Sequence, residues 1–362
     1  MRLPFHADHI GSLIRPPDLV DAQAQADAGV MTASELEAVQ RSSIAAIVHK
    51  QQEHGVRALT SGEFDRKWYF SGFFEKLGGF REVAPVPWDL ARLAAPPIAA
   101  LRRAGQQYMM AAVCESKITY DAGASPYLPN WRMLRDAVAR DRWAECKFTM
   151  PPPCYFHLRL ATGKCYDRNV YPDDGAFFAD LARAYQAELR TLYDDGLRNL
   201  QIDDPTLAYF CSEDMLQALR DDGDDPDALF DTSGSYDKIA QRFFTTLNYD
   251  TFFLEYDDPR SGGFEPLRHL PVGKNVVLGV VTTKDPALED GRVIRDRILE
   301  AANVIAEGQG RSVDEAMQDI GISPQCGFAS VAVGADGMTE ERMFAKLKLV
   351  KDVAAELWPD RP

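Results

Sequence analysis

Two side chains that are typical metal ligands stand at the ends of predicted strands. Glu255 follows the apolar run Thr251-Phe252-Phe253-Leu254, and Cys326 follows a strand that begins at Gly321. Thiolate and carboxylate are both good zinc ligands, and a fixed sheet can aim them at one point. A lone cysteine in an apolar strand is more often a small core residue, and a strand-end glutamate is often only solvated or paired. The two residues therefore allow either a zinc role or a structural one.

Two further carboxylates, Glu63 and Asp203, end two other predicted strands. Paired carboxylates can hold an ammonium group or share a proton. The alternative is an ordinary ion pair, in which Arg15 or Arg66 would neutralise Glu63. Asp203 is followed directly by Asp204, and this concentration of negative charge at a strand end favours a functional role for Asp203.

Two histidines could line the same site. His9 lies on the first predicted strand and could point into a central pocket, and His157 follows the run Pro151-Pro152-Pro153. Neither shows the helical HExxH spacing, and each is more often a hydrogen-bonded structural histidine. Gly78-Gly79 and Gly262-Gly263 do not match phosphate-binding loops, so nucleotide binding has no support.

Composition narrows the class of protein. The 362 residues hold 40 Lys and Arg against 55 Asp and Glu, and the net charge of −15 would repel a nucleic-acid backbone. The chain shows neither a signal peptide nor the roughly 18 uninterrupted apolar residues that a membrane span needs. Its six cysteines are spread through a long chain without a signal peptide, which predicts thiols in a reducing compartment. They form no CxxC pair, which excludes a zinc ribbon. We expect a soluble, cytoplasmic protein without nucleic-acid or membrane partners, and no feature indicates an oligomeric state.

Strands and helices alternate along the chain, which predicts parallel βα units. The predicted strands are 6–12, 58–63, 146–150, 199–203, 251–255, 275–281 and 321–325. The predicted helices are 33–54, 174–195, 212–220, 236–247, 291–307 and 339–357. A chain of this length most economically closes such a sheet as a single (β/α)8 TIM-type barrel over residues 1–362. The carboxyl ends of barrel strands converge on one pocket, so the polar strand-end residues should meet there.

Two intervals depart from a regular barrel. Residues 65–130 are too long for one crossover and are predicted to elaborate the barrel mouth, with a hairpin between Tyr108 and Tyr120. Between the helices 212–220 and 236–247 the alternation demands a fifth strand, but residues 221–235 have loop composition. The barrel is therefore distorted at its fifth strand, or part of a βα unit of roughly 30 residues is missing.

Taken in order, five strand-end motifs resemble the C-terminal catalytic barrel of cobalamin-independent methionine synthase, most closely its short single-barrel members. The motifs are His9-Ile10-Gly11-Ser12, Ser61-Gly62-Glu63, Gln201-Ile202-Asp203-Asp204-Pro205, Phe253-Leu254-Glu255-Tyr256-Asp257 and Ser323-Pro324-Gln325-Cys326-Gly327. Any one of them would be weak, but five in unbroken order over nearly the whole chain make the resemblance specific.

The resemblance implies a zinc methyltransferase of methionine synthesis, which moves a methyl group from a methylated folate to the thiol of homocysteine. Zinc would lower the thiol pKa so that a thiolate forms at neutral pH. Ser12, Glu63 and Asp203 would hold the amino-acid part of homocysteine, with the two carboxylates facing its ammonium group. Glu255 and Cys326 would be zinc ligands.

One family feature is missing. The family takes its other two zinc ligands from a His-x-Cys motif on the fifth strand, and this chain contains no His-x-Cys. The fifth strand, which would carry this motif, is expected in the interval 221–235, where the count of predicted strands is also one short. Three explanations follow: a segment lost in deriving the sequence, substitute ligands such as His9, His157 or Cys154, or a metal-free protein. Loss of an inner strand would expose two sheet edges, and total stability is only about 5–15 kcal/mol, which favours the first explanation.

Two other functions stay open on the same scaffold. Zinc-activated thiolate chemistry serves any electrophile, so the protein could alkylate another thiol or cleave a thioether. A metal-free homologue could instead bind an amino acid without catalysis.

Overall fold

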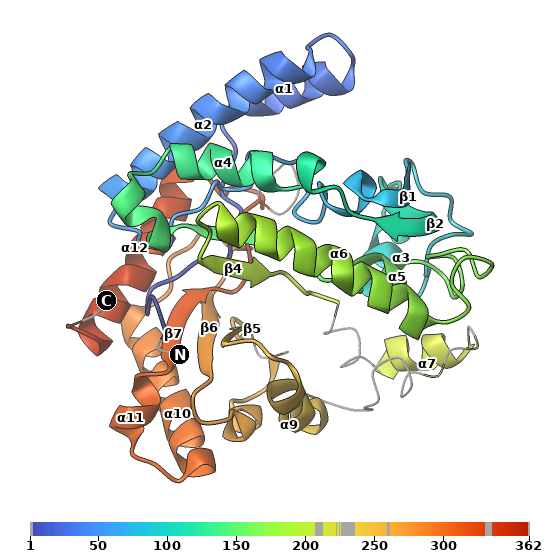
Figure 1. The fold of residues 1–362 in the computed structure, drawn as a ribbon. Coiled ribbons are helices and arrows are strands. Elements are labelled where there is room, and N and C mark those ends of the chain that lie inside the picture. Colours follow the sequence, from blue (N-terminus) through green and yellow to red (C-terminus); the bar gives the residue numbers. More distant parts are fainter. Residues whose placement is uncertain are drawn as a thin grey trace. The chain divides into compact units, whose positions relative to one another are not determined.

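The computed structural model describes residues 3–206, 213–221, 223, 225, 236–258, 261–329 and 335–360 (Figure 1). The chain divides into two compact units, each built from separate stretches of sequence. Unit 1 comprises Met1–Tyr69, Met133–Phe148 and Ala240–Pro362, and unit 2 comprises Phe70–Arg132 and Thr149–Ile239.

A three-stranded parallel sheet forms the centre of unit 1. Its strands are β5 (Thr251–Glu255), β6 (Asn275–Val281) and β7 (Ile320–Pro324), and β6 lies between the other two. All seven residues of β6 are buried, as expected for an inner strand of a parallel sheet.

Two short segments of unit 1 make further parallel pairs. Ala7 bridges Ile322 of β7, and Asp8 N donates a hydrogen bond to Ile322 O at 2.9 Å. A second parallel bridge joins Leu59 to Cys146. Each of these segments lies where a strand was predicted.

Helices of unit 1 begin at recognisable caps. They are α1 (Pro17–Asp27), α2 (Ala33–Glu53), α10 (Gly291–Gln309), α11 (Val313–Met317) and α12 (Glu340–Leu357). Thr32 and Glu35 form a capping box at α2, and Thr339 caps α12. A Cβ atom at Gly308 would lie 2.2 Å from Arg268 O, so the glycine lets α10 pack closely on the short helix η6 (Glu265–His269).

Unit 2 contains an antiparallel pair of strands and several helices. β1 (Gly78–Val83) pairs with β2 (Ala111–Thr119), and Val83 lies opposite Ala111. The helices are α3 (Pro96–Arg103), α5 (Tyr155–Arg159), α6 (Asp174–Asp194) and α7 (Glu213–Asp221). Asp173 caps α6 through a 2.7 Å hydrogen bond from Ala176 N.

Three elements run from one unit into the other along the chain: α4 (Leu128–Asp136), α9 (Tyr236–Thr246) and β3 (Lys147–Met150). β3 forms a two-stranded sheet with β4 (Asn199–Ile202). The remaining short helices are η1 (Phe74–Lys76), η2 (Ala122–Ala124) and η3 (Arg140–Glu145).

Most of the predicted elements are confirmed. Five predicted strands are present as β3 to β7, the other two appear as the bridges at Ala7 and Leu59, and all six predicted helices are present within a few residues. The fold is mixed α/β with parallel pairing, but the described residues form separate small sheets and no closed barrel. The interval 221–235 lies almost wholly outside the described residues.

One prediction was wrong. The segment from Tyr108 to Tyr120 is not a hairpin, because residues 111–119 form the single strand β2, whose partner β1 lies upstream. The physical reason is visible in Ala111–Thr119, which contains no glycine, proline, asparagine or aspartate that could make a tight turn.

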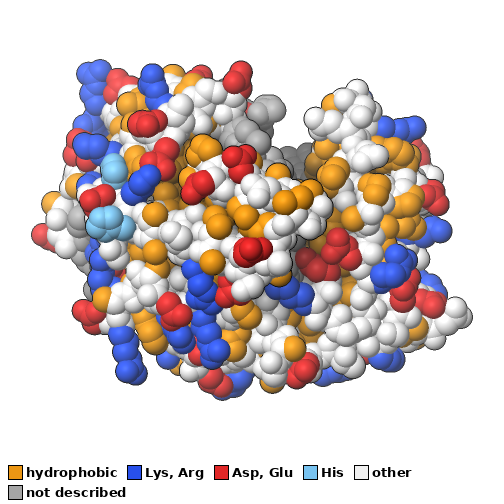
Figure 2. All heavy atoms as spheres, turned by 90° about the horizontal axis from the view of Figure 1, so that it is seen from above, with side chains coloured by type: hydrophobic (Ala, Val, Ile, Leu, Met, Phe, Trp, Pro, Cys, Tyr) orange, Lys and Arg blue, Asp and Glu red, His pale blue; other side chains and the backbone are white. Residues whose placement is uncertain are grey.

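On the face shown in Figure 2, acidic, basic and hydrophobic side chains are interspersed, and no patch of one kind indicates a particular partner. No helix within the described ranges is both long and apolar enough to cross a membrane.

Candidate functional site

The two predicted zinc ligands come from strands on either side of β6. Glu255 is the last residue of β5 and lies opposite Gly279, which lies opposite Ser323 of β7. Neighbouring strands are about 4.8 Å apart, so the backbones at Glu255 and Ser323 are separated by roughly 10 Å. Cys326 follows β7 at the same end of the sheet. Glu255 is exposed and Cys326 is half-buried.

The turn that carries Cys326 is anchored on β6. A Cβ atom at Gly279 would lie 2.6 Å from Gln325 Cα, so only glycine lets the turn cross the strand this closely. Gln325 N donates to Val281 O at 2.8 Å, and Gln325 Oε1 accepts from Thr283 N at 2.7 Å. Thr283 Oγ1 also donates to Gly327 O at 3.3 Å. Cys326 is therefore held between two fixed neighbours.

Ser12 is tied to the loop that follows this turn. Its Oγ accepts a hydrogen bond from Ala329 N at 3.3 Å, and its carbonyl accepts one from Phe328 N at 2.9 Å. Ser12 is buried. The first motif thus contacts the residues that directly follow the last motif, and all of them belong to unit 1.

Glu63 is buried in a strained turn of the same unit. Its φ of 62° lies in the left-handed region, which costs a residue with a side chain about 1–3 kcal/mol. Arg66 Nη2 lies 3.7 Å from Glu63 Oε1, and both side chains are 3% exposed. The predicted pairing with Arg66 is confirmed.

Arg15 joins the loops that carry these motifs. Its guanidinium donates from Nη1 to Ala329 O at 2.8 Å and from Nη2 to the carbonyls of Glu63 and Arg66, both at 3.1 Å. The sequence indicated Arg15 only as an ion-pair partner of Glu63. Its observed role is to hold three backbone carbonyls, which composition and spacing do not reveal.

Asp203 belongs to unit 2 and is half-buried. Its backbone N donates to Met150 O at 2.9 Å, and its Oδ1 accepts from Gln201 Nε2 at 2.5 Å. These contacts fix the carboxylate at the end of β4, which is where the sequence placed it.

Cys154 lies close to the neighbouring carboxylate. Its Sγ donates to Asp204 Oδ2 at 3.5 Å. Burial and the negative charge of Asp204 raise the pKa of the Cys154 thiol well above its usual range. In this structure the Cys154 thiol is a hydrogen-bond donor to Asp204.

The two histidines are engaged elsewhere. His157 Nε2 lies 3.2 Å from Asp174 Oδ1, and His9 Nε2 donates to Ala58 O at 2.8 Å. Among the described residues, no three His, Cys, Asp or Glu side chains are grouped so that they could hold a metal ion. A catalytic zinc ion needs three protein ligands, so this part of the chain does not complete a zinc site.

Burial of His9 predicts a pH dependence of stability. Burial, followed by the positive charge of Lys147, lowers the pKa of His9 from 6.5 to about 4. Between these values the unfolded chain binds a proton that the folded chain does not, so stability falls as the pH drops from 6.5 to 4. We expect His9 to contribute about 3 kcal/mol to this fall.

The measurement is the free energy of unfolding in denaturant at several pH values across this window. The variant His9→Gln should flatten the slope, whereas His49→Gln should leave it unchanged because the His49 side chain is 70% exposed. Equal slopes in the wild type and in His9→Gln would contradict the assignment.

Comparisons with known proteins place the chain among relatives of nearly equal extent. No family model matches it. It is similar to two uncharacterized proteins of Bacillus subtilis. It is 31% identical to YxjH over 99% of this chain and 96% of that protein. It is 33% identical to YxjG over 98% of this chain and 95% of that protein. It is 22% identical to a methionine synthase of Pyrococcus abyssi over 96% of this chain and 90% of that protein.

The alignment with YxjH is longer than this chain. It extends over 391 residues, whereas the chain has 362, so at least 29 of its positions fall opposite gaps in this chain. YxjH therefore carries residues that have no counterpart in this chain.

A solved structure supports the same relationship. The putative vitamin-B12 independent methionine synthase of Listeria monocytogenes superposes with a TM-score of 0.69, at 26% identity over 99% of both chains. The match confirms the resemblance seen in the five strand-end motifs. The chain belongs to the cobalamin-independent methionine synthase family.

Proposed function

We propose that the protein transfers a methyl group from a methylated folate to the thiol of homocysteine. Its family supports methyl transfer in methionine synthesis. The observation that carries the proposal is the cluster in unit 1, where Ser12, buried Glu63 and the anchored Cys326 turn are joined through Ala329 and Arg15.

The residues of this cluster suit the amino-acid part of homocysteine. Glu63 presents a carboxylate in a site that water hardly reaches, where attraction to an ammonium group is stronger than in bulk solvent. The family resemblance assigns the hydroxyl of Ser12 and the carboxylate of Asp203 to the same substrate. Holding both ends of the amino acid would orient the thiol toward the methyl donor.

Zinc dependence is part of the proposal but rests on the family. Glu255 and Cys326 are the side chains that would bind zinc, and zinc would lower the pKa of the homocysteine thiol so that it reacts as a thiolate. The described residues do not complete its ligand set, so no step is assigned to the metal. We propose that the natural protein carries a further segment at the interval 221–235, with the His-x-Cys ligands and a fifth strand.

The same segment would complete the predicted architecture. We propose a single (β/α)8 barrel over residues 1–362, with residues 65–130 elaborating its mouth, and the match to the Listeria structure over 99% of both chains supports it. We also propose a cytoplasmic location, because Cys114, Cys146, Cys154, Cys165 and Cys326 are free cysteines.

Thiol selectivity tests the proposed substrate. Homocysteine should be methylated with a kcat/KM at least about 100-fold above that of 4-mercaptobutanoate, which lacks only the amino group, because the contacts of Glu63 and Asp203 with the substrate ammonium group would be lost. The assay follows methylated thiol by mass spectrometry with methyltetrahydrofolate as donor.

The other outcomes identify the alternatives. Similar rates with both thiols would indicate alkylation of a different thiol. Homocysteine binding without methyl transfer, in a form that carries the His-x-Cys segment, would indicate a non-catalytic amino-acid-binding protein.

A further inference from the structure

A lysine with no exposed surface lies on the buried face of α12. Lys346 is 0% exposed, and the neighbouring residues Phe344, Leu347 and Val350 are buried as well. An ammonium group is strongly hydrated in water, so its burial is costly unless protein atoms replace the lost water. A leucine or methionine at this position would pack with the same neighbours without that cost. The contacts of the ammonium group therefore call for an explanation.

Each N–H group of the Lys346 ammonium has an acceptor. Nζ donates to Ala287 O at 2.6 Å, and to Glu289 Oε1 and Oε2 at 3.0 and 2.9 Å. Three acceptors match the three donors of the ammonium group. Ala287 and Glu289 both belong to residues 282–290, which join β6 to α10 and are called the 282–290 loop below. The buried charge thus ties α12 to this loop.

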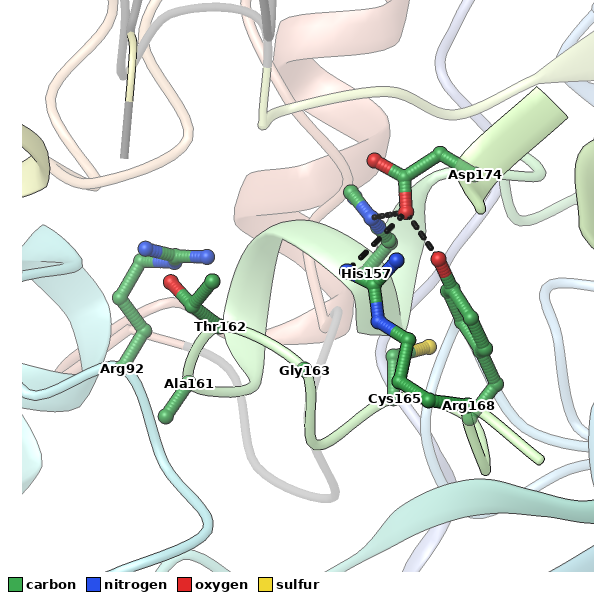
Figure 3. A pocket seen from close by; sticks show the side chains of 9 residues that line it. Arg92, His157, Ala161, Thr162, Gly163, Cys165, Arg168 and Asp174 are labelled. Atoms are coloured by element: carbon green, nitrogen blue, oxygen red, sulfur yellow. Dashed lines mark hydrogen bonds and ion pairs between the residues drawn. The ribbon is translucent and has the colours of Figure 1, made fainter. Parts of the chain in front are cut away.

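The ion pairs of Asp174 in unit 2 are a useful contrast. Figure 3 shows Asp174 with His157 and Arg168, whose nitrogen atoms lie 3.2 and 3.9 Å from its Oδ1. The Asp174 side chain is 43% exposed, so water competes with both partners. Water does not reach Lys346, and a buried ammonium group that loses its partner is strongly destabilising. Its contacts with the 282–290 loop are therefore held much more firmly.

The Glu289 carboxylate also fixes the beginning of the 282–290 loop. Its Oε1 accepts a hydrogen bond from Thr282 N at 2.8 Å. Thr282 directly follows β6, and Glu289 directly precedes the capping residue of α10. One carboxylate, held by Lys346, therefore closes the loop between its two ends.

Thr283 transmits this constraint to the turn that carries Cys326. Its N–H and its hydroxyl make the two hydrogen bonds to Gln325 and Gly327 described above. A continuous series of contacts therefore leads from Lys346 through the 282–290 loop to the residues on either side of Cys326. All of these residues belong to unit 1.

We propose that Lys346 is a positioning residue for the Cys326 turn, and that it acts through Glu289 and the 282–290 loop. An apolar residue in its place would leave Ala287 O and the Glu289 carboxylate without their donor, and the loop would be free to move away from the turn. The inference rests on the proposed function for the importance of Cys326.

The alkylation rate of Cys326 by iodoacetamide in the folded 362-residue chain tests the proposal, with peptide mass spectrometry to identify each labelled cysteine. Lys346→Met keeps an apolar side chain of similar length but removes the three donors. The Cys326 rate should rise at least about fivefold, because the turn opens more often when the loop no longer restrains it. Cys146 is fully buried in the same unit and should stay as slow as in the wild type.

Lys348→Met is the matched control. It removes the same charge two residues away on α12, from a side chain that is 64% exposed and pairs with Asp352 of the same helix. The Cys326 rate in this variant should stay within about twofold of the wild type.

The double variant Lys346→Met/Glu289→Met separates positioning from stability. Replacement of a buried ion pair by two apolar side chains is often neutral for stability, so the free energy of unfolding should return toward the wild-type value. Thr282 N would still lack its acceptor, and the Cys326 rate should therefore remain raised.

Three results would overturn the proposal. They are an unchanged Cys326 rate in Lys346→Met, an equal rise at Cys146, and a double variant in which wild-type stability and slow Cys326 labelling return together. The labelling uses no substrate. A failure of methyl transfer would therefore count against the proposed function and would leave this test unaffected.

Discussion

The 362-residue chain is expected to retain far less than one zinc ion per molecule, below about 0.2 after dialysis. Glu255 and Cys326, which follow the strands that flank β6, would provide two ligands, and the described residues offer no group of three. Two ligands leave half of a four-coordinate zinc shell to water, and such a site loses its metal readily. Elemental analysis, after the intact mass has been confirmed, gives the stoichiometry.

A form of the protein in which the proposed segment is restored gives a second test of the zinc content. If a fifth βα segment with a His-x-Cys motif is inserted at 221–235, the ligand set is complete and the zinc content should rise to about one per chain. Cys326→Ala in this form should remove the zinc. Cys146→Ala is the matched control, because Cys146 is a fully buried thiol whose pKa burial raises to about 12, and it should keep the metal.

Each contrary result has a definite meaning. Near one zinc ion in the 362-residue chain would show that other side chains complete the shell, and a deletion would then be unnecessary. Unchanged zinc content in Cys326→Ala would remove Cys326 from the site.

The order of elements could be predicted because it depends on local patterns. Buried runs such as Asn275–Val281 and capping residues such as Thr32 act over a few residues, and they define strands and helix starts in the sequence itself. The convergence of Ser12 with the Cys326 turn also follows, since the ends of parallel strands share one edge.

Other features could not be predicted because they depend on distant partners. The pairing of β2 with β1 joins residues far apart in the chain, and the sequence of Ala111–Thr119 alone does not specify it. Gly279 was a missed signal, since a glycine inside a β-branched strand often marks a close backbone approach. The contacts of the Arg15 guanidinium join residues far apart in the chain, so no motif reveals them.

Replacement of Asp203 by asparagine should affect homocysteine far more than the methyl donor. If the Asp203 carboxylate faces the substrate ammonium group, Asp203→Asn removes a charge-assisted contact of about 1.5–3 kcal/mol and should raise the KM for homocysteine roughly 10-fold to 100-fold. The KM for methyltetrahydrofolate should stay within about twofold, because the donor does not use this carboxylate. Steady-state kinetics of the segment-restored form, with each substrate varied in turn, measures both values.

Asp204 supplies the matched control for this experiment. Its carboxylate accepts hydrogen bonds from Thr206 N at 3.0 Å and from Cys154 Sγ at 3.5 Å, so its contacts lie within the protein. Asp204→Asn removes the same charge as Asp203→Asn, one residue away. It should reduce the stability of the protein without a selective effect on the KM for homocysteine. If Asp203→Asn raised both KM values equally, or if Asp204→Asn produced the larger selective effect, Asp203 would lose its role in holding the amino acid. The site would then rest on Ser12 and Glu63, whose contacts in unit 1 do not depend on Asp203.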